Sequence, residues 1–192
     1  MLNFVEILAD GEQCDLPQRP LFMAIGTFDG VHLGHVKLIS TTIDRAVGCD
    51  GIAIVYTFRP HPTVITHPNN PKPMLCTFEE KYKIFLHYNL FRIAEQKFDE
   101  NFSRMTPSNF VEFLIQKFPT LCGICVGENF KFGQNRSGNT DTLVSCLEKF
   151  GISVTVIPAL MIGNERVSSS KIRELLNRGD TEKAKLMLGR GL

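Results

Sequence analysis

Apolar and polar positions alternate with two different periods along this chain of 192 residues. Short continuous apolar runs bounded by turn-forming residues predict buried strands, and apolar positions spaced three and four residues apart predict amphipathic helices. The predicted strands cover residues 21–25, 52–58, 90–94, 121–126 and 153–157. The predicted helices cover residues 36–46, 78–87, 106–117, 140–150, 168–177 and 181–188.

The alternation of strands with helices indicates an α/β fold. A parallel strand needs a crossover connection, which is most often a helix, so we expect a mostly parallel sheet with helices on both faces. Residues 59–73 contain five prolines, and we expect them to form a loop. The chain is long enough for one well-cored domain and short for two.

Composition and charge exclude several classes of protein. The contents of 43% hydrophobic and 21% charged residues are ordinary globular values. A formal net charge of +1 argues against nucleic acid held by bulk electrostatics. No apolar run approaches the ~20 residues of a membrane span, and the first residues lack the basic start of a signal peptide. We therefore expect a cytoplasmic protein with small-molecule partners, and the sequence leaves its oligomeric state open.

The cysteines are scattered along the chain and form no framework. Cys122 and Cys125 match a C-x-x-C pattern, which is typical of a redox pair or half a zinc site. They fall in a predicted strand, however, where residues three apart point to opposite faces. We interpret all six cysteines as buried reduced thiols. They are Cys14, Cys49, Cys76, Cys122, Cys125 and Cys146.

The motif GTFDGVHLGH, residues 26–35, lies between a predicted strand and a predicted helix. Such a glycine-rich turn presents backbone N–H groups and a helix dipole to a phosphate. His32 and His35, on one face of the first helical turn, suit a polyphosphate whose charge rises during reaction. Three glycines among residues 26–34 indicate that something approaches the backbone closely. The alternative is a surface turn whose histidines only cap the helix.

Two further motifs follow predicted strands. In TFRPHP, residues 57–62, prolines hold His61 in an extended geometry, although this could be an ordinary proline turn. In VGENFKFGQNRSG, residues 126–138, two phenylalanines could offer ring faces and two cations could meet phosphate. The alternative is a solvated loop in which the phenylalanines Phe130 and Phe132 share one face and at least one is buried.

The motif RVSSSKIR, residues 166–173, places serines where a helix begins. Serine hydroxyls cap exposed backbone N–H groups, which would explain the cluster completely. The same hydroxyls and N–H groups, together with Arg166 and Arg173, could instead bind a phosphate.

Together, GTFDGVHLGH, TFRPHP, VGENFKFGQNRSG and RVSSSKIRELL resemble, in identity and order, the N-terminal FMN adenylyltransferase module of bacterial FAD synthetases. The resemblance extends from about residue 22 to residue 190. It implies a Rossmann-like nucleotidyltransferase fold of the H-x-G-H superfamily and the reaction of FMN with ATP to give FAD and pyrophosphate. The wider superfamily shares only the first and last motifs, so the middle two indicate the flavin substrate.

The resemblance also implies which residues form the site. The catalytic set that it implies is His32, His35, Asn129, Arg166, Ser169, Ser170 and Arg173. The implied ATP-binding residues are Gly26, Thr27, Phe28, Gly34 and Arg173. The implied flavin-binding residues are Phe58, Pro60, His61 and Pro62. Magnesium is expected to come with ATP and to bridge its phosphates, and no protein ligand is assigned to it.

This chain departs from the family pattern at three points. Thr27 stands where many relatives have asparagine, although a hydroxyl can still donate a hydrogen bond, and Ser170 replaces a frequent threonine and keeps its hydroxyl. In the family, a sequence like LLGR leads into a riboflavin kinase module, and here the chain stops at that point. We therefore expect residues 1–188 to form the adenylyltransferase domain and residues 189–192 to begin a linker, without riboflavin kinase activity.

Two other functions remain open from the sequence. One is an H-x-G-H nucleotidyltransferase with a different acceptor, such as phosphopantetheine or nicotinate mononucleotide. The other is a non-catalytic module that binds a flavin or a nucleotide. Both histidines, both arginines and the serine cluster are present, which speaks against the second alternative.

Overall fold

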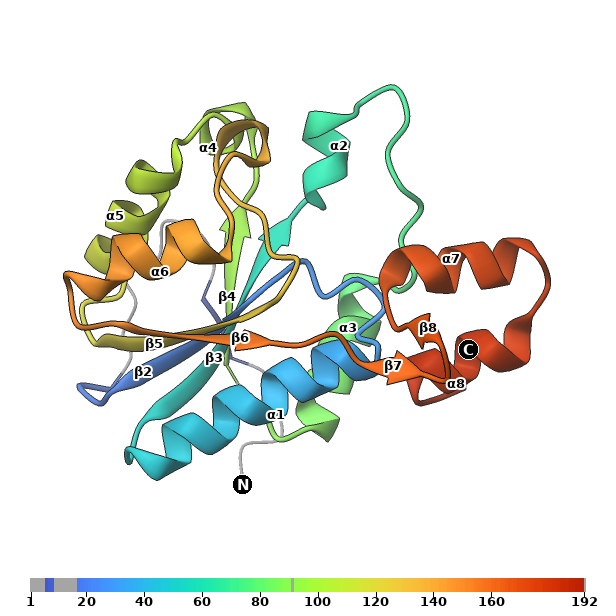
Figure 1. Ribbon diagram of the computed structural model, residues 1–192, viewed down its shortest axis with the longest axis horizontal. Coiled ribbons are helices and arrows are strands. Elements are labelled where there is room, and N and C mark those ends of the chain that lie inside the picture. Colours follow the sequence, from blue (N-terminus) through green and yellow to red (C-terminus); the bar gives the residue numbers. More distant parts are fainter. Residues whose placement is uncertain (1–5, 9–16, 91, 192) are drawn as a thin grey trace.

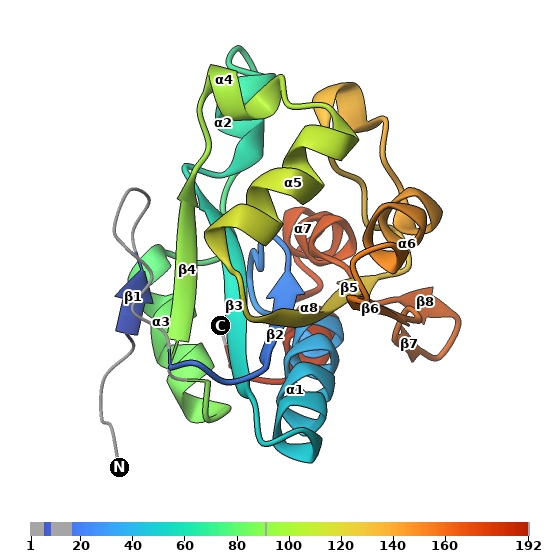
Figure 2. The same cartoon turned by 90° about the vertical axis from the view of Figure 1, so that its left-hand side faces the viewer.

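Among the residues that the structure describes, six strands form one sheet in which every neighbouring pair is parallel. The computed structural model describes residues 6–8, 17–90 and 92–191, and Cys14 lies outside these ranges. The strands are β1 (Glu6–Leu8), β2 (Leu21–Ile25), β3 (Ile52–Arg59), β4 (Arg92–Lys97), β5 (Leu121–Gly127) and β6 (Ser153–Ile157). Figure 2 shows their order, β1-β4-β3-β2-β5-β6, from left to right. The predicted parallel α/β sheet is confirmed.

Helices cover both faces of the sheet, as Figure 1 shows. Helices α1 (Leu33–Gly48) and α3 (Phe78–His87) pack on one face, and α5 (Pro107–Lys117) and α6 (Thr140–Glu148) pack on the other. Successive residues of a strand point to opposite faces. Met23 of β2 therefore belongs to the cluster that includes Phe110 of α5 and Leu143 of α6, whereas Ala24 belongs to the cluster that includes Ile39 of α1 and Phe85 of α3.

The last part of the chain forms a small unit at one end of the sheet. It contains the hairpin of β7 (Met161–Ile162) and β8 (Glu165–Arg166), followed by α7 (Ser169–Asn177) and α8 (Thr181–Leu188). The two helices bury apolar residues of their own against each other. Figure 1 shows this unit beside the loop that connects β2 to α1. This contact brings the first and last sequence motifs together.

Several predicted elements have the observed bounds. The strands at residues 21–25 and 153–157 and the helix at residues 78–87 agree with β2, β6 and α3. Helix α3 begins where it was predicted because Thr77 and Glu80 form a capping box, in which each side chain accepts a hydrogen bond from the other residue's backbone N–H. Helix α1 begins at Leu33, three residues before the predicted start, since His32 caps it.

Other predicted bounds were wrong. The strand predicted at residues 90–94 lies at Arg92–Lys97, and residue 91 is outside the described ranges. Its pairing with β3 continues over the polar residues Glu95 and Gln96, which no apolar run marks. The prolines at residues 59–73 do not keep the whole segment in a loop. The segment contains the short helix α2 (Pro62–Thr66). Proline is tolerated in the first turn of this helix because the N–H that it lacks would have no partner within the helix.

Several short elements were not predicted at all. They are the edge strand β1, the helix α4 (Glu100–Ser103), the 3₁₀ helix η1 (Gln134–Arg136) and the hairpin of β7 and β8. The prediction that all cysteines are buried was also wrong. The five described cysteines are free thiols, but Cys49 and Cys122 are exposed. Cys125 is buried, so the C-x-x-C pair does point to opposite faces of β5. In the described part of the chain, no helix combines the length and apolar character needed to cross a membrane.

Candidate active site

The motifs that follow strands lie at one edge of the sheet. Strands β2, β3 and β5 are adjacent and parallel, so their carboxyl ends point the same way. Residues 26–35 follow β2, the TFRPHP motif lies at the end of β3, and residues 128–138 follow β5. The carboxyl edge is where open parallel sheets bind their ligands. We call residues 26–35 the histidine loop.

The two histidines of this loop are stacked on each other. His32 is the N-cap of α1, and its Nδ1 accepts a hydrogen bond of 3.3 Å from the backbone N–H of His35. The ring centroids are 3.7 Å apart and the ring planes are inclined by 13°. The expected placement of both histidines on one face of the first helical turn is therefore corrected, because His32 precedes that turn. His32 therefore caps α1 and also stacks on His35.

The surroundings keep both imidazoles neutral at pH 7. Burial lowers the pKa of His32 from 6.5 to about 4, and the positive charges of Arg190 and Arg166 add to this shift. Burial, followed by the neighbouring His32, Lys81 and Arg190, lowers the pKa of His35 well below its ordinary value. Since Nδ1 of His32 accepts a hydrogen bond, its proton lies on Nε2, which can donate to a ligand. Nδ1 of His35 is buried and has no partner among the described residues.

The glycines of the histidine loop make room for the protein's own side chains. A Cβ atom on Gly26 would lie 3.2 Å from the ring of Phe28, and one on Gly34 would lie 3.2 Å from the ring of His32. Gly30 has a φ of +75°, which is unfavourable for other residues. The close approach predicted from these glycines therefore occurs inside the protein. It does not by itself indicate a ligand.

Phe28 and Thr27 lie in the turn but contribute in different ways. Phe28 is completely buried and packs edge-on against Phe85, with a centroid distance of 5.6 Å, so its side chain does not face a ligand. Thr27 is half-buried, and its carbonyl accepts a hydrogen bond of 2.9 Å from Nζ of Lys81. Lys81 is only 1% exposed. Its role was not predicted, although a buried lysine in the predicted helix at residues 78–87 is a conspicuous exception to the amphipathic pattern.

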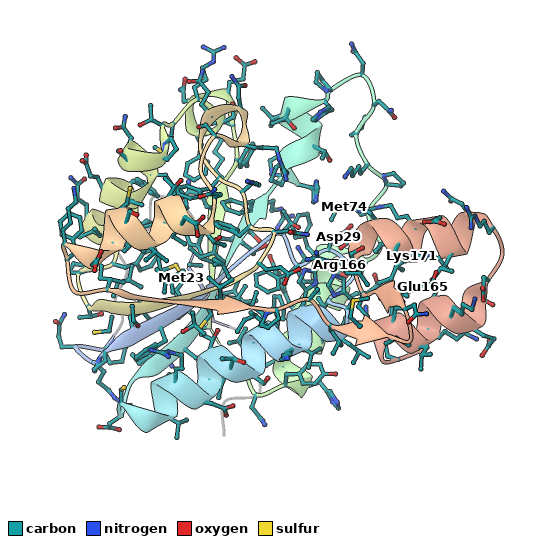
Figure 3. The ribbon with its side chains drawn as sticks, in the orientation of Figure 1. Met23, Asp29, Met74, Glu165, Arg166 and Lys171 are labelled. Atoms are coloured by element: carbon teal, nitrogen blue, oxygen red, sulfur yellow. The ribbon has the colours of Figure 1, made fainter. Side chains whose placement is uncertain are left out.

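Asp29 joins the histidine loop to α7 and was also missed. Its side chain is 1% exposed, accepts a 2.9 Å hydrogen bond from the backbone N–H of Leu75 and forms an ion pair with Arg173. Nε of Arg173 donates to the carbonyl of Pro73 at 2.7 Å. Two of the three guanidinium nitrogens of Arg173 therefore hold the protein together. Figure 3 labels Asp29 between the sheet and the C-terminal helices.

The serine cluster divides its tasks among three residues. Ser168 caps α7, because its Oγ accepts a 3.2 Å hydrogen bond from the backbone N–H of Lys171. Ser169 donates from its Oγ to the carbonyl of Asp29 at 2.9 Å, and Ser170 is exposed. The capping interpretation of the motif is thus confirmed for Ser168. Ser169 contacts the histidine loop directly.

Arg166 reaches the same region from β8. Its NH1 lies 2.9 Å from Oε1 of Glu128, and Oε2 of Glu128 accepts a 3.0 Å hydrogen bond from the backbone N–H of Ala159. With its amide oxygen turned toward Arg166, Asn129 accepts from NH2 of that arginine at 2.8 Å. The charge of Arg166 also acts on the pKa of His32. Asn129, Arg166 and the histidine pair are therefore brought together, and Glu128, which was not predicted, fixes the arginine.

The residues predicted for the flavin lie at the end of β3. The Arg59–Pro60 peptide bond is cis, and His61 caps α2 through a 3.2 Å hydrogen bond that its Nδ1 accepts from the backbone N–H of Thr63. Burial lowers the pKa of His61, and the nearby charges of Asp29 and Arg173 act on it in opposite directions. His61 and Pro62 are half-buried, so this turn faces the histidine loop and α7 with part of its surface open.

Aromatic rings gather at this edge of the sheet. Phe58 packs with Phe98 and Phe102, with centroid distances of 5.7 and 5.9 Å. Phe130 and Phe132 stack at 5.5 Å with planes 17° apart. Phe132 is buried, with 7% exposed, whereas Phe130 is half-buried. The prediction that these two phenylalanines share a face and that at least one is buried is confirmed.

The carboxylates near the site do not form a ready metal site. Asp29 and Glu128 are both ion-paired with arginines. Within residues 6–8, 17–90 and 92–191, no three His, Cys, Asp or Glu side chains are grouped as a metal ion requires. A divalent ion at this edge would therefore need ligands that a substrate supplies.

The parallel sheet, with a stacked histidine pair at the start of the first long helix and an arginine–asparagine pair beside it, defines an α/β protein whose polar groups gather at the edge where such sheets bind ligands. The chain belongs to the FAD synthetase family, whose sequence model matches residues 15–171.

Curated relatives agree with this assignment. The chain is 34% identical to a bifunctional riboflavin kinase/FMN adenylyltransferase of Buchnera aphidicola over 169 residues, which are 88% of this chain and 54% of the relative. It is 32% identical to the protein of the same name from Bacillus subtilis over 90% of this chain and 54% of the relative. It is 29% identical to an FAD synthetase of Listeria monocytogenes over 89% of this chain and 69% of the relative. The chain thus spans about half the length of the two bifunctional relatives.

Solved structures share the fold. A protein from Streptococcus pneumoniae titled a macrolide-efflux protein superposes with a TM-score of 0.84 over 96% of this chain and 60% of its own, at 20% sequence identity. Pantoate-beta-alanine ligase from Francisella tularensis superposes with a TM-score of 0.56 over 95% of this chain and 86% of its own, at 14% identity. At these identities the likeness concerns the fold alone.

Proposed function

We propose that this chain is an FMN adenylyltransferase, which transfers the AMP group of ATP to FMN and releases pyrophosphate. One observation carries the proposal. The stacked His32 and His35 lie at the start of α1, beside Arg166 and Asn129, in a chain of the FAD synthetase family. The proposed reaction forms one P–O bond between the FMN phosphate and the α-phosphorus of ATP and breaks the bond from that phosphorus to the pyrophosphate oxygen.

The FMN phosphate is the nucleophile in this proposal. A phosphate monoester is already anionic, so the reaction requires no covalent enzyme intermediate. Catalysis then consists of aligning the two phosphates and stabilising the negative charge that develops. The sheet supports this assignment, because the strands that precede the residues proposed for ATP and for the flavin are neighbours and end at the same edge.

The histidine pair would stabilise the developing charge by donating hydrogen bonds. His32 is neutral with its proton on Nε2, so it donates to a phosphate oxygen without exchanging its proton. The N-terminus of α1 adds its dipole, since helix N-termini bind anions. The stacking fixes the angle of both rings before substrate arrives, which removes the cost of ordering them during the reaction.

The positive groups around the loop would hold the ATP phosphates. Arg166 and Asn129 support this role most directly, as they are paired with each other and lie beside His32. Ser169 and Arg173 support it through the histidine loop that they hold, and Ser170 through its exposed hydroxyl. Gly26, Thr27 and Gly34 would offer backbone groups, and Phe28 would act only through its backbone.

The flavin would lie at the end of β3. We propose that His61 and its flanking prolines receive the FMN phosphate, with Phe58 and the half-buried Phe130 beside the ring system. Two observations support this: β3 is the direct neighbour of β2 in the sheet, and the charges of Asp29 and Arg173 both act on the pKa of His61. An aromatic ring face suits the planar flavin.

Magnesium would enter with ATP. The described carboxylates at the site are already paired, so the donor set does not fit a protein-bound ion, and the phosphate oxygens would supply its ligands. Magnesium commonly binds in this way, with few protein ligands and several phosphate oxygens. Because both substrates are small charged molecules and the net charge is only +1, we also propose a cytoplasmic enzyme without a nucleic-acid partner.

The direct test supplies FMN, ATP and magnesium to the purified chain and separates the products by chromatography. We expect FAD and pyrophosphate in equal amounts. Parallel incubations with phosphopantetheine and nicotinate mononucleotide test other acceptors. Pyrophosphate release with one of these and not with FMN would overturn the flavin assignment, and tight FMN binding without any FAD would indicate a non-catalytic module.

A further inference from the structure

The histidine loop is held from outside through its backbone carbonyls. Thr27 accepts from Lys81 and Asp29 accepts from Ser169, at 2.9 Å each. The carbonyls of Gly30 and Val31 accept from a single residue, Arg190, at 2.5 and 3.0 Å.

Arg190 comes from the far end of the chain. It lies 160 residues after Gly30, in the segment predicted to begin a linker, residues 189–192. Gly189, in a left-handed conformation with φ of +72°, ends α8 and turns the chain toward the loop. A Cβ atom on Gly189 would lie 2.4 Å from Leu33, the first residue of α1. The end of α8 therefore packs against the start of α1.

The part of the loop that Arg190 holds has an unusual backbone. Val31 has a φ of +35°, which is rare for a β-branched residue, and it directly precedes His32. Such conformations persist where the surrounding structure determines them. The two guanidinium contacts go to the carbonyls of the two peptide groups that flank the Val31 Cα, and they are suited to fix it because the planar guanidinium presents several donors in a rigid geometry.

The hydrogen-bond partners of Arg190 do not neutralise its positive charge. No carboxylate of the described residues forms a salt bridge with it, and its hydrogen-bond acceptors are carbonyl groups. The charge is felt at the histidine pair, where it lowers the pKa of both rings. The other groups that act on those rings are Arg166 from β8 and Lys81 from α3.

We propose that Arg190 is a positioning residue for adenylyl transfer, which holds the Gly30 and Val31 carbonyls and thereby sets the orientation of His32. The proposal rests on the proposed function for its kinetic consequence, but its structural part does not. In the alternative, Arg190 only attaches the end of α8, and its loss would lower stability without changing the site.

The test compares Arg190→Met, Arg190→Lys and a matched control, Arg178→Met. Arg178 lies in the same C-terminal unit, but its side chain is 71% exposed and pairs with Glu174. Three quantities are measured for each protein: the midpoint of thermal unfolding, kcat with KM for each substrate, and the pKa of His32 by NMR titration. The NMR titration requires no turnover, and Arg190→Lys keeps the positive charge, so a raised His32 pKa in that variant reports a changed placement of the ring even if the wild-type protein makes no FAD.

For Arg190→Met we expect kcat to fall by about 10²-fold, the cost of misplacing a catalytic group by about 1 Å, while KM for FMN changes less than twofold. The pKa of His32 is expected to rise. Arg190→Lys should restore part of kcat, because one ammonium can still serve one carbonyl. Arg178→Met should match the wild type in all three measurements.

Wild-type kcat and an unchanged His32 pKa in folded Arg190→Met protein would overturn the proposal. So would a variant that loses stability alone while its folded fraction turns over normally. If Arg190→Met does not fold, Arg190→Lys decides: a lower kcat with a raised His32 pKa supports the positioning role, and wild-type values of both contradict it.

Discussion

At the scale of single residues, the candidate site depends on neutral groups that positive charges surround. His32 and His35 are stacked and uncharged at pH 7, whereas Arg166, Arg190 and Lys81 keep the positive charge around them. A neutral imidazole beside cations donates a hydrogen bond without losing its proton. The histidines therefore supply hydrogen-bond donors, and other side chains supply the positive charge.

Replacement of His32 by alanine tests the donor role. We expect His32→Ala to lower kcat by about 10²–10³-fold, the usual cost of removing one preorganised donor, while FMN binding persists. His35→Ala should have a smaller effect. The matched control is His87→Ala, at an exposed position on α3. Steady-state kinetics and FMN titration give both quantities, and wild-type turnover in His32→Ala would contradict the assignment.

The lowered histidine pKa values predict how stability depends on pH. The unfolded chain binds a proton at each histidine near pH 6.5, whereas folded His32 binds one only near pH 4. The unfolded state therefore takes up more protons in this window, and the free energy of unfolding falls as the pH falls. We expect a slope of about 1.4 kcal/mol per pH unit for each such histidine.

Urea unfolding between pH 6.5 and about 5.5 measures this slope at pH values where carboxylates are almost fully ionised. His32→Gln removes one titrating group and should reduce the slope, and the same measurement on His87→Gln, at an exposed position of α3, serves as the control. A stability that does not vary with pH in this window would contradict the neutral, buried histidines.

At the scale of elements, α7 is joined to the histidine loop by a buried ion pair, Asp29–Arg173, and by the hydrogen bond from Ser169 to the Asp29 carbonyl. Replacement of Arg173 by methionine leaves the Asp29 carboxylate buried without its counter-charge, so we expect a loss of about 3–5 kcal/mol in unfolding free energy. Arg178→Met, on an exposed pair at the end of the same helix, should cost less than about 1 kcal/mol. Chemical denaturation measures both.

The same ion pair makes a kinetic prediction. In Arg173→Ala we expect KM for ATP to rise more than KM for FMN, because the loop that Arg173 holds carries the proposed phosphate ligands.

The double variant Asp29→Asn/Arg173→Met should recover part of the stability that Arg173→Met loses, since no uncompensated charge stays buried. Additive losses in the double variant would show that the two side chains do not act as a pair.

The hairpin of β7 and β8 depends on an ion pair that is partly exposed. Glu128 holds Arg166 at 2.9 Å, with more than a third of each side chain accessible to water. Glu128→Gln should therefore raise KM for ATP by less than about tenfold, because an exposed pair contributes at most about 1 kcal/mol. Arg166→Ala should have the larger effect. Equal effects of the two substitutions would mean that Arg166 acts only through Glu128.

At the scale of the whole molecule, the described residues build one sheet, its covering helices and the small C-terminal unit. The histidine loop, which carries several of the residues proposed for ATP, lies where that unit joins the sheet, as Figure 1 shows. Tested by themselves, these 192 residues are expected to make FAD from supplied FMN but no FMN from riboflavin. Transfer of a γ-phosphoryl group to a ribityl hydroxyl requires its own positioning site.

Chromatography of a riboflavin and ATP incubation tests this expectation, with FMN and ATP as the positive control. Formation of FMN at a rate comparable with FAD synthesis would show that the domain assignment is misplaced.

The sequence by itself determined the class of fold and the edge of the sheet at which the motifs gather. Apolar runs alternating with amphipathic segments predicted the parallel sheet, and helix caps such as Thr77 set helix starts correctly because capping is a local interaction. The site motifs follow β2, β3 and β5, and parallel pairing is enough to bring those strand ends to one edge.

Only the tertiary structure decided which groups hold the site in place. The Asp29–Arg173 pair joins residues 144 positions apart, and Arg190 reaches Gly30 across 160 positions. No local pattern marks such contacts, because their energy comes from burial and from partners elsewhere in the chain. The same holds for the glycines of the histidine loop, whose neighbours are the rings of Phe28 and His32. The motifs indicated chemistry, and long-range packing determined the partner of each charged group.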